Sequence, residues 1–516
     1  MSIIPISTNG LPGVSITEST YGVVPAAIAD HSSMYMLLHS TNPEMDYDTL
    51  YFISNQTDAD NVIGVSDSQA AIKLYFAQYP ETGFYAVSVR PRQELSFTIT
   101  LGSVGATYTL TLDGYAVSEV GLAGDTITTI SDRLVTKVNK AASHLATAVK
   151  RGSTYYLRKA QTGTVVTGSS NITLGTAGAV PSYPTAQDVL DSAMTVLVGD
   201  LRQGFIVAPE FYQNETSQAN WALLANGLDA LCARDSHKWV SLVDCREATA
   251  TTVTGAGAIN MIQDDRALLQ SPNGHSALYF PYWIDKNGVN VPMSTSVVAI
   301  AIKRYRINFA DAPAGTSYPV YGTTGQTFKV NDQQQAILNP LGINCGRVFT
   351  QANLSSRKGS VVYGARTVSA SPYWRFVTTR VIANVLEGSL RYAFDTFIFA
   401  TLDGQGEAFN RITQTATSIC ERLRAAKALY GKTPTEAYLV VCDNTNNPAL
   451  VLENGQVAVD VYFKPSPLLE HLTIRCHRTS LETVITEALG QGNAGTATEG
   501  KPASNPSESG SGSTPA

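Results

Sequence analysis

Two glycine-containing patterns in the sequence contain residue types that bind phosphates. Gly431-Lys432-Thr433 matches the end of a phosphate-binding loop, in which backbone amides and a lysine hold phosphate oxygens. Ala426 stands where that loop needs its first glycine, and a helical pattern precedes it where a strand is required. Gly404 and Gly406 lack the third glycine and the leading strand of a dinucleotide-binding turn. The sequence therefore predicts no nucleotide and no other cofactor.

Histidine and acidic residues give no catalytic or metal-binding arrangement. His471 and His477 lie six residues apart on a predicted strand, so they share one face while Cys476 points to the other. The remaining histidines lack the spacing of metal ligands. Asp264 and Asp265 are adjacent, and adjacent side chains rarely converge on one substrate. We predict no catalytic residue, no metal site and no enzymatic activity.

Composition narrows the classes of partner. Of the 516 residues, 44% are hydrophobic and 15% are charged, whereas about a quarter are charged in an ordinary soluble protein. Much of the surface is therefore expected to contact protein. A net charge of -6 provides no basic field, so no direct nucleic acid is expected. Apolar runs are far shorter than the roughly 20 residues that span a bilayer, so no membrane insertion is expected. The six scattered cysteines and the absence of a signal sequence indicate reduced thiols in a cytosol-like compartment.

Strand and helix patterns alternate through most of the chain, which predicts a multidomain α/β (α+β) protein. Residues 1–22 contain too little apolar surface for a core and are predicted to form an extended arm. Residues 23–92 and 186–365 are predicted to form one discontinuous α/β domain, in which the apolar run at 297–302 is interpreted as a buried strand. Residues 93–185 alternate Thr, Ser, Tyr and Val, which predicts an inserted β-rich domain on the outer surface, with one helix near 126–142.

Residues 366–489 are predicted to form a C-terminal domain of two long helices and a sheet. The first helix extends from 377 to 397, and the second carries apolar residues in steps of three and four from Phe409 to Tyr430. Strands are predicted at 437–442, 457–463 and 472–476. Residues 490–516 are rich in Gly, Ser, Thr, Pro and Ala and are predicted to be disordered.

Several segments, in the same order, resemble contractile bacteriophage tail sheath proteins. These segments are Pro12-Gly13-Val14-Ser15-Ile16-Thr17-Glu18, the core strand at 276–283, Val291-Pro292-Met293-Ser294, Gly364-Ala365-Arg366-Thr367, and 428–443 with Asn446, Asn447 and Gly455. The chain departs from the family pattern in three places. Ser15 stands where an aromatic residue is common, Thr379-Arg380 replaces a pair of arginines, and residues 402–405 replace a Glu-Pro-Asn motif.

This resemblance implies a structural subunit that stacks in helical rings and contracts. Expected partners are further copies of the chain, a tail tube protein, and baseplate and tail terminator proteins. The expected location is the virion tail, after assembly in the cytoplasm of the bacterial host. The extended sheath is expected to store its energy during assembly, so no nucleotide is needed.

Two sets of residues are expected to make the contacts of such an assembly. Segments with unpaired backbone groups can join the sheet of a neighbour, which predicts inter-subunit strand exchange at Val14, Ser15, Ile16, Thr17 and at Leu472, Thr473, Ile474, Arg475, Cys476. The C-terminal domain is expected to face the tube, with Arg422, Arg424 and Lys427 as candidates for weak ion pairs. The alternative for these three cations is a merely solvated charged face.

Two other functions stay open on the sequence alone. The first is the sheath of a phage-derived contractile injection or bacteriocin apparatus. The second, from a different class, is an envelope-acting hydrolase whose β-rich segment is a binding domain. That hydrolase would be a monomer, whereas a sheath protein forms rings or tubes.

Overall fold

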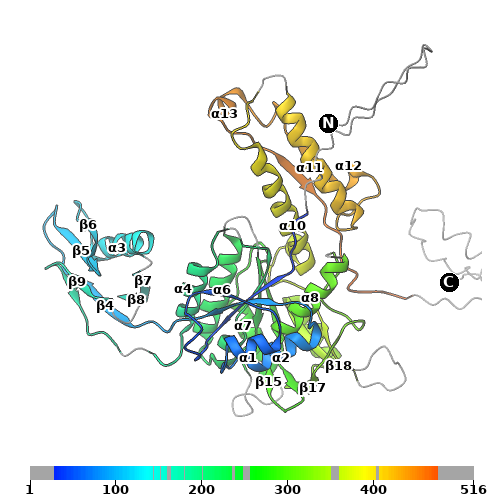
Figure 1. The fold of residues 1–516 in the computed structure, drawn as a ribbon, viewed down its shortest axis with the longest axis horizontal. Helices are drawn as coiled ribbons and strands as arrows, with labels where there is room; N and C mark the ends of the chain where they lie inside the picture. The colour runs from blue at the N-terminus through cyan, green and yellow to red at the C-terminus, as the bar shows by residue number, and fades with distance from the viewer. Residues whose placement is uncertain are drawn as a thin grey trace, which may run out of the picture. The chain divides into compact units, whose positions relative to one another are not determined.

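The computed structural model describes residues 28–474, except 143–144, 152, 160–163, 179–180, 200, 235–238, 248–255, 309, 350–358 and 403–405. The largest sheet in this part of the chain has nine strands (Figure 1). Their order is β16 (Pro319–Val320), β19 (Gly359–Tyr363), β18 (Ile343–Phe349), β13 (Ser276–Phe280), β12 (Trp239–Asp244), β11 (Gly204–Val207), β1 (Ser33–Leu38), β3 (Phe84–Ser88) and β2 (Leu50–Ile53).

The six strands from β18 to β3 run parallel, and both faces of this sheet are covered. Met34, Met36 and Leu38 of β1 enter one apolar cluster, while Tyr35 and Leu37 enter the other. This alternation follows from the two-residue period of a strand, and double coverage explains why these strands are mostly apolar. The prediction of a mixed α/β fold is therefore confirmed.

Helices from different parts of the chain cover the two faces. Buried residues of α1 (Gln56–Val62), α2 (Gln69–Gln78) and α8 (Ser294–Asn308) pack on one face. The other face is covered by α4 (Ala186–Val196), α5 (Pro209–Asn214), α6 (Gln218–Ala233), α7 (Ala256–Ala267) and α9 (Asp332–Leu338). A small three-stranded sheet has the order β15 (Asn290–Val291), β14 (Trp283–Asp285) and β17 (Thr323–Gln326). Its strands fall between α7 and α9 in the sequence.

The strand predicted at 297–302 is wrong, because these residues form the middle of α8. All six are buried, with exposures between 0 and 4%. A helix that is buried on all sides needs no polar face, so its apolar run lacks the helical periodicity and resembles a central strand.

Asp244, the last residue of β12, holds the start of α8. Its Oδ1 accepts a hydrogen bond of 2.8 Å from the backbone N–H of Ser294, and the residue is fully buried. Burial raises the pKa of this carboxyl to about 7, although the hydrogen bonds from Ser294 oppose the shift. In the unfolded chain the pKa is about 3.9. Between these values the native state binds the extra proton, so stability falls as the pH rises.

Replacing Asp244 by Asn is therefore expected to remove this loss. The amide keeps an oxygen for the Ser294 N–H but does not ionise. Each pH unit in the window costs the wild type about 1.4 kcal/mol, so the variant should gain roughly 2–3 kcal/mol relative to the wild type between about pH 5 and pH 7. Urea unfolding of both proteins across this range measures the difference. Parallel stability curves would show that Asp244 does not titrate there.

Residues 94–174 form two further sheets with a cluster of their own. One sheet has the order β10 (Ile172–Leu174), β4 (Glu94–Ile99), β8 (Thr154–Lys159), β7 (Ala146–Arg151), and the other β6 (Tyr115–Val120), β5 (Thr107–Leu112), β9 (Val166–Gly168). The predicted helix is confirmed as α3 (Ile127–Ala141), whose Ile130, Leu134 and Val138 repeat every four residues and enter this cluster. The buried members of the cluster all come from residues 95–172.

The C-terminal part contains the two predicted long helices, α10 (Val377–Phe394) and α11 (Glu407–Ala425), with the short η4 (Asp395–Phe397) after the first. They are followed by α12 (Pro434–Ala437), β20 (Tyr438–Val441), α13 (Ala449–Glu453) and β21 (Asp460–Phe463). The apolar seam of α11 is confirmed, since Ile412, Ala416, Ile419 and Leu423 are buried. The helix ends five residues earlier than predicted.

Two further observations concern the described helices and cysteines. None of these helices is both long and apolar enough to cross a membrane. The five cysteines in the described part, at 232, 245, 345, 420 and 442, are all free thiols. The predicted domain boundaries stay predictions, and the predicted arm at 1–22 and tail at 490–516 lie outside the described residues.

Candidate assembly surfaces

The sheet of β20 and β21 has two strands only in the described part of the chain. The strands are antiparallel, and Leu439 lies directly opposite Tyr462. These two side chains are 57% and 60% exposed, whereas Val440 and Val461 pack against the main apolar cluster. Each strand therefore has one partner and one outer edge. A two-stranded sheet is marginally stable by itself, and its edges can accept further strands.

The predicted strand-exchange segments have different places relative to the described chain. Val14, Ser15, Ile16 and Thr17, together with Arg475 and Cys476, lie outside it. Leu472 and Ile474 are 68% and 77% exposed, and with Thr473 they belong to no helix or strand. Their pairing with another copy of the chain stays a prediction.

The three predicted tube-facing cations do not form one equivalent set. Arg424 pairs with Glu421, whose two carboxylate oxygens each lie 3.0 Å from the Arg424 Nε. The hydroxyl of Tyr438 donates to the same carboxylate at 3.0 Å. The Arg424 guanidinium holds the pKa of Glu421 below its usual value. The charge of Arg424 is therefore balanced within its own chain. Arg422 and Lys427 are exposed.

The end of α11 explains where Lys427 lies. The helix stops at Ala425, and Lys427 has a left-handed backbone with φ of 62°. Its N–H donates to the carbonyl of Arg424 at 2.9 Å, and its own carbonyl accepts from the hydroxyl of Ser466 at 2.8 Å. The chain then turns, so Tyr430 is not on the helix and is 63% exposed. The prediction that the helix continues to Tyr430 is therefore wrong.

In the segment that resembles a phosphate-binding loop, a side chain of the same protein bonds the backbone N–H groups. The Glu436 side chain accepts hydrogen bonds from the N–H groups of Lys432, at 2.8 Å, and Thr433, at 3.4 Å. These are backbone donors of the kind that phosphate oxygens use in such a loop. Gly431 is required for a different reason, because a Cβ there would lie 2.8 Å from the backbone nitrogen of Ala437. The structure thus explains this motif by local packing.

The described residues also contain no cluster of possible metal ligands. Within those residues no group of three His, Cys, Asp or Glu side chains could hold an ion. His471 is exposed, and its predicted strand neighbour His477 lies outside the described part.

Comparison with models of protein families and with curated proteins gave no match. Solved structures do match over nearly the full chain. The contracted sheath of the extracellular contractile injection system PVC is 15% identical, with a TM-score of 0.56 and coverage of 92% of this chain and 99% of that chain. The contracted helical sheath of the anti-feeding prophage (AFP) is 16% identical, with a TM-score of 0.53 and coverage of 91% and 99%.

A chain of the contracted AFP baseplate gives a similar result. It is 14% identical, with a TM-score of 0.54 and coverage of 92% of this chain and 100% of that chain. These identities are low, so the agreement concerns the fold. Across more than nine-tenths of its length, this chain has the fold of contractile sheath proteins.

Proposed function

We propose that this chain is the sheath subunit of a contractile bacteriophage tail, and a structural protein without catalytic activity. It polymerises as a helical stack of rings around a tail tube, and contraction drives the tube through the host envelope for genome ejection. The observation that carries the proposal is the match to sheath chains over 99% of their length. Baseplate and terminator proteins are the further partners, and the virion tail is the location.

A phage-derived injection apparatus is a second candidate. The contracted sheaths compared above come from the PVC injection system and the anti-feeding prophage, which favours this reading. In both candidates the chain is a sheath subunit around a tube. They differ in what the tube delivers. Capsid and portal genes beside the gene for this chain would identify a phage.

Strand exchange through the sheet of β20 and β21 is the mechanism that we propose for linking the subunits. The chain has two segments with strand patterns near its ends, at 14–17 and 472–476, and this sheet has two outer edges. An added strand satisfies backbone groups on both partners without a private core. Copies joined in this way stay connected while their bodies rotate and slide.

Contraction then needs two states of the same polymer. The extended state is kinetically trapped, and the contracted state is better packed. Because the linked arms keep neighbouring copies together, the lattice can shorten without dissociating. The energy is stored during assembly, which is why the chain needs no nucleotide.

The contact with the tube is proposed to use the exposed end of α11. Arg422, Arg424 and Lys427 are the candidate cations there, and Glu421 balances the charge of Arg424. Exposed ion pairs are worth less than about 1 kcal/mol each, and salt screens them. Such contacts suit a surface that has to release the tube when the sheath contracts.

Negative-stain microscopy of the purified chain tests the function. Tubes or stacked rings are expected, whereas dispersed monomers at every concentration would refute a sheath role. The same grids can test the tube contact by adding the tube protein. Reversing the charges of Arg422 and Lys427 should leave sheath tubes intact and lower their association with the tube. Equal association of the variant would refute this contact.

A further inference from the structure

A cavity of about 600 Å³ lies where three segments of the chain meet. They are the last turn of α7, the short helix η1 (Asn339–Leu341) before β18, and residues 366–375, which connect β19 to α10. Gly342 permits this packing, because a Cβ there would collide with the carbonyl oxygen of Thr367. Of the eleven described residues that line the cavity, three are arginines and none is Asp or Glu. The arginines are Arg266, Arg366 and Arg375.

Arg266 belongs to the last turn of α7 and is held by neutral groups. Its Nε donates to the carbonyl oxygen of Leu341 at 2.7 Å, its Nη1 to that of Leu269 at 3.3 Å, and its Nη2 to that of Val368. Burial lowers the pKa of this guanidinium below its usual value. The three bonds fix the side chain but use only three of its five N–H groups. Two N–H groups and the full positive charge are left for a ligand.

Arg366 and Arg375 bring two more positive charges to the same cavity. Arg366 donates from Nη1 to the carbonyl oxygen of Asn339 at 3.1 Å. Arg375 is exposed, and its guanidinium bonds no other residue of the described chain. The backbone holds these two arginines near each other, because Arg366 pairs with Phe376 in an antiparallel bridge and the N–H of Thr367 donates to the Arg375 carbonyl at 2.9 Å.

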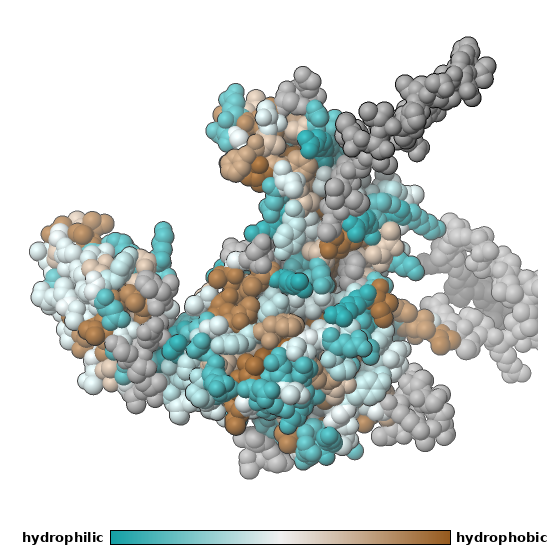
Figure 2. Space-filling view, viewed as in Figure 1, coloured by the Kyte–Doolittle hydropathy of each residue, from teal (hydrophilic) through white to brown (hydrophobic). Residues whose placement is uncertain are grey.

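Acidic residues near this cavity in the chain do not neutralise its charge. Asp265 of α7 is buried, and its Oδ1 lies 2.7 Å from Nη2 of Arg246. Asp264 is exposed and does not line the cavity. The hydrophilic residues near the centre of Figure 2 lie over α1 and α2, which pack on the face of the large sheet opposite α7. Arg266 and Arg375 therefore have no carboxylate partner among the described residues.

The lining suits an anion with several phosphate groups. Guanidinium groups match phosphate oxygens through pairs of parallel N–H bonds. The volume equals that of about twenty water molecules and falls within the usual range for small-molecule sites. No Trp, Tyr, Phe or His lines the cavity, so a nucleobase would find no ring on which to stack. An inorganic phosphate chain therefore fits this lining better than a nucleotide does.

We propose that this cavity binds a polyvalent phosphate-class oxyanion, such as inorganic tripolyphosphate, between Arg266 and Arg375, with Arg366 as the third cation. The bound anion joins α7 to residues 366–375, which precede α10. This segment already bonds the large sheet, because the N–H of Val368 donates to the carbonyl of Ser276 at 2.9 Å. The anion adds charge-assisted bonds across the same junction. The site lies within one copy of the chain, so it goes beyond the proposed function and does not depend on assembly.

Calorimetric titration of the full chain with sodium tripolyphosphate, in low-salt buffer without phosphate or divalent cations, tests the proposal. One anion per chain is expected. Arg375→Met should fold normally, since it removes an exposed guanidinium, and should weaken binding about tenfold or more through the lost charge-assisted bonds. Arg202→Met is the matched control, because Arg202 is also exposed but lies outside the cavity. Its affinity should change less than about twofold.

Two results of this titration would overturn the proposal. The first is the absence of binding to the wild-type chain. The second is the same affinity for Arg375→Met and for the wild type, because the anion would then bind elsewhere.

Charge reversal gives a second measurement that needs no ligand. Arg375→Glu places a carboxylate near Arg266 and Arg366, so it should abolish tripolyphosphate binding and raise the thermal unfolding midpoint of the ligand-free chain. Arg202→Glu changes the net charge equally, but outside the cavity, and should do neither. A midpoint for Arg375→Glu at or below that of Arg202→Glu would contradict the uncompensated positive charge on which the site depends.

Two other anions distinguish the class of ligand. ATP carries the same phosphate chain attached to a nucleoside, and it should bind no more tightly than tripolyphosphate, because no ring lines the cavity. Citrate carries three carboxylates with less negative charge, and it should bind more weakly. Tighter binding of ATP would indicate nucleotide recognition, and tighter binding of citrate would indicate a carboxylate site. Either result would overturn the assignment to inorganic phosphate chains.

Discussion

A chain that lacks residues 1–20 is expected to fold normally and to form no long tubes. In the part of the chain that the structure describes, the buried members of the three apolar clusters lie at residue 34 or beyond, and the deletion removes none of them. It removes Val14–Thr17, which are a proposed link to neighbouring copies. Circular dichroism should match that of the full chain, while negative-stain images should show single subunits or short rings.

The deletion ends at residue 20, well before Ala29 and His31, which contact α10. The N–H of Ala29 donates to the Ser389 hydroxyl of α10 at 2.8 Å, and His31 Nε2 lies 3.3 Å from the Asn384 amide. A Cβ at Gly388 would lie 2.2 Å from the Gln203 amide nitrogen, so glycine permits this close packing. Residues 29–31 are thus held on α10, the first of the two long C-terminal helices.

Removal of residues 490–516 is the matched control for this deletion. It shortens the chain by a similar length, but at a segment to which no subunit contact is assigned. That variant should form tubes like those of the full chain. Long tubes from the chain lacking residues 1–20 would refute the arm as a link between copies.

In α11 the sequence predicted which helix face is buried, because the opposite face is polar. In α11 the apolar positions from Ile412 to Leu423 are spaced by three or four residues, because only one side of the helix is buried. In α8 the same logic fails, since burial on every side erases the period. The end of α11 also could not be predicted, because Ala426 and Tyr430 continue the spacing after the helix has stopped.

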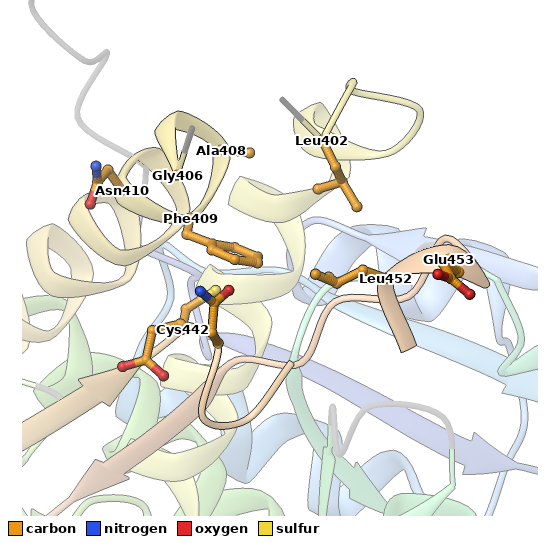
Figure 3. A pocket seen from close by; sticks show the side chains of 10 residues that line it. Leu402, Gly406, Ala408, Phe409, Asn410, Cys442, Leu452 and Glu453 are labelled. Atoms are coloured by element: carbon orange, nitrogen blue, oxygen red, sulfur yellow. The ribbon is translucent and has the colours of Figure 1, made fainter. Parts of the chain in front are cut away.

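The candidate site was predicted less completely than the fold. Glu421 and Arg424 are three residues apart on a helix, a spacing that favours an ion pair and could have shown that Arg424 is engaged. A cavity beside Phe409 had no such signal, because its described lining comes from three separate segments between residues 402 and 453 (Figure 3). Proximity of this kind depends on tertiary packing and not on local spacing.

Arg158 of β8 illustrates a long-range arrangement with a large energetic consequence. Its side chain is 1% exposed and bonds three carboxylates: Nε lies 2.9 Å from Asp191 Oδ2, Nη1 lies 2.8 Å from Glu94 Oε1, and Nη2 bonds Asp188. Asp188 and Asp191 belong to α4, so this cluster joins the β-rich residues 94–174 to a helix of the large sheet. Arg92 adds bonds to the Asp188 carbonyl and the Ser192 hydroxyl at 3.0 and 3.1 Å.

Arg158→Met is expected to destabilise the chain by about 3–5 kcal/mol, because it leaves two buried carboxylates without their principal cation. Methionine retains most of the apolar stem, so the loss reports charge more than volume. Arg133→Met is the matched control in the same β-rich part, since Arg133 also pairs with two carboxylates but is 34% exposed. Its loss should be less than about 1 kcal/mol.

Urea unfolding of both variants measures these losses, and hydrogen exchange locates them. Exchange should increase in β8 and α4 of the Arg158 variant, because the cluster connects those elements. Adding Asp188→Asn and Asp191→Asn to Arg158→Met removes the unpaired charges and should recover part of the stability. If Arg158→Met and Arg133→Met lose the same amount, the buried cluster is no stronger than a surface pair. The junction between the β-rich part and α4 would then depend on apolar packing and backbone connections alone.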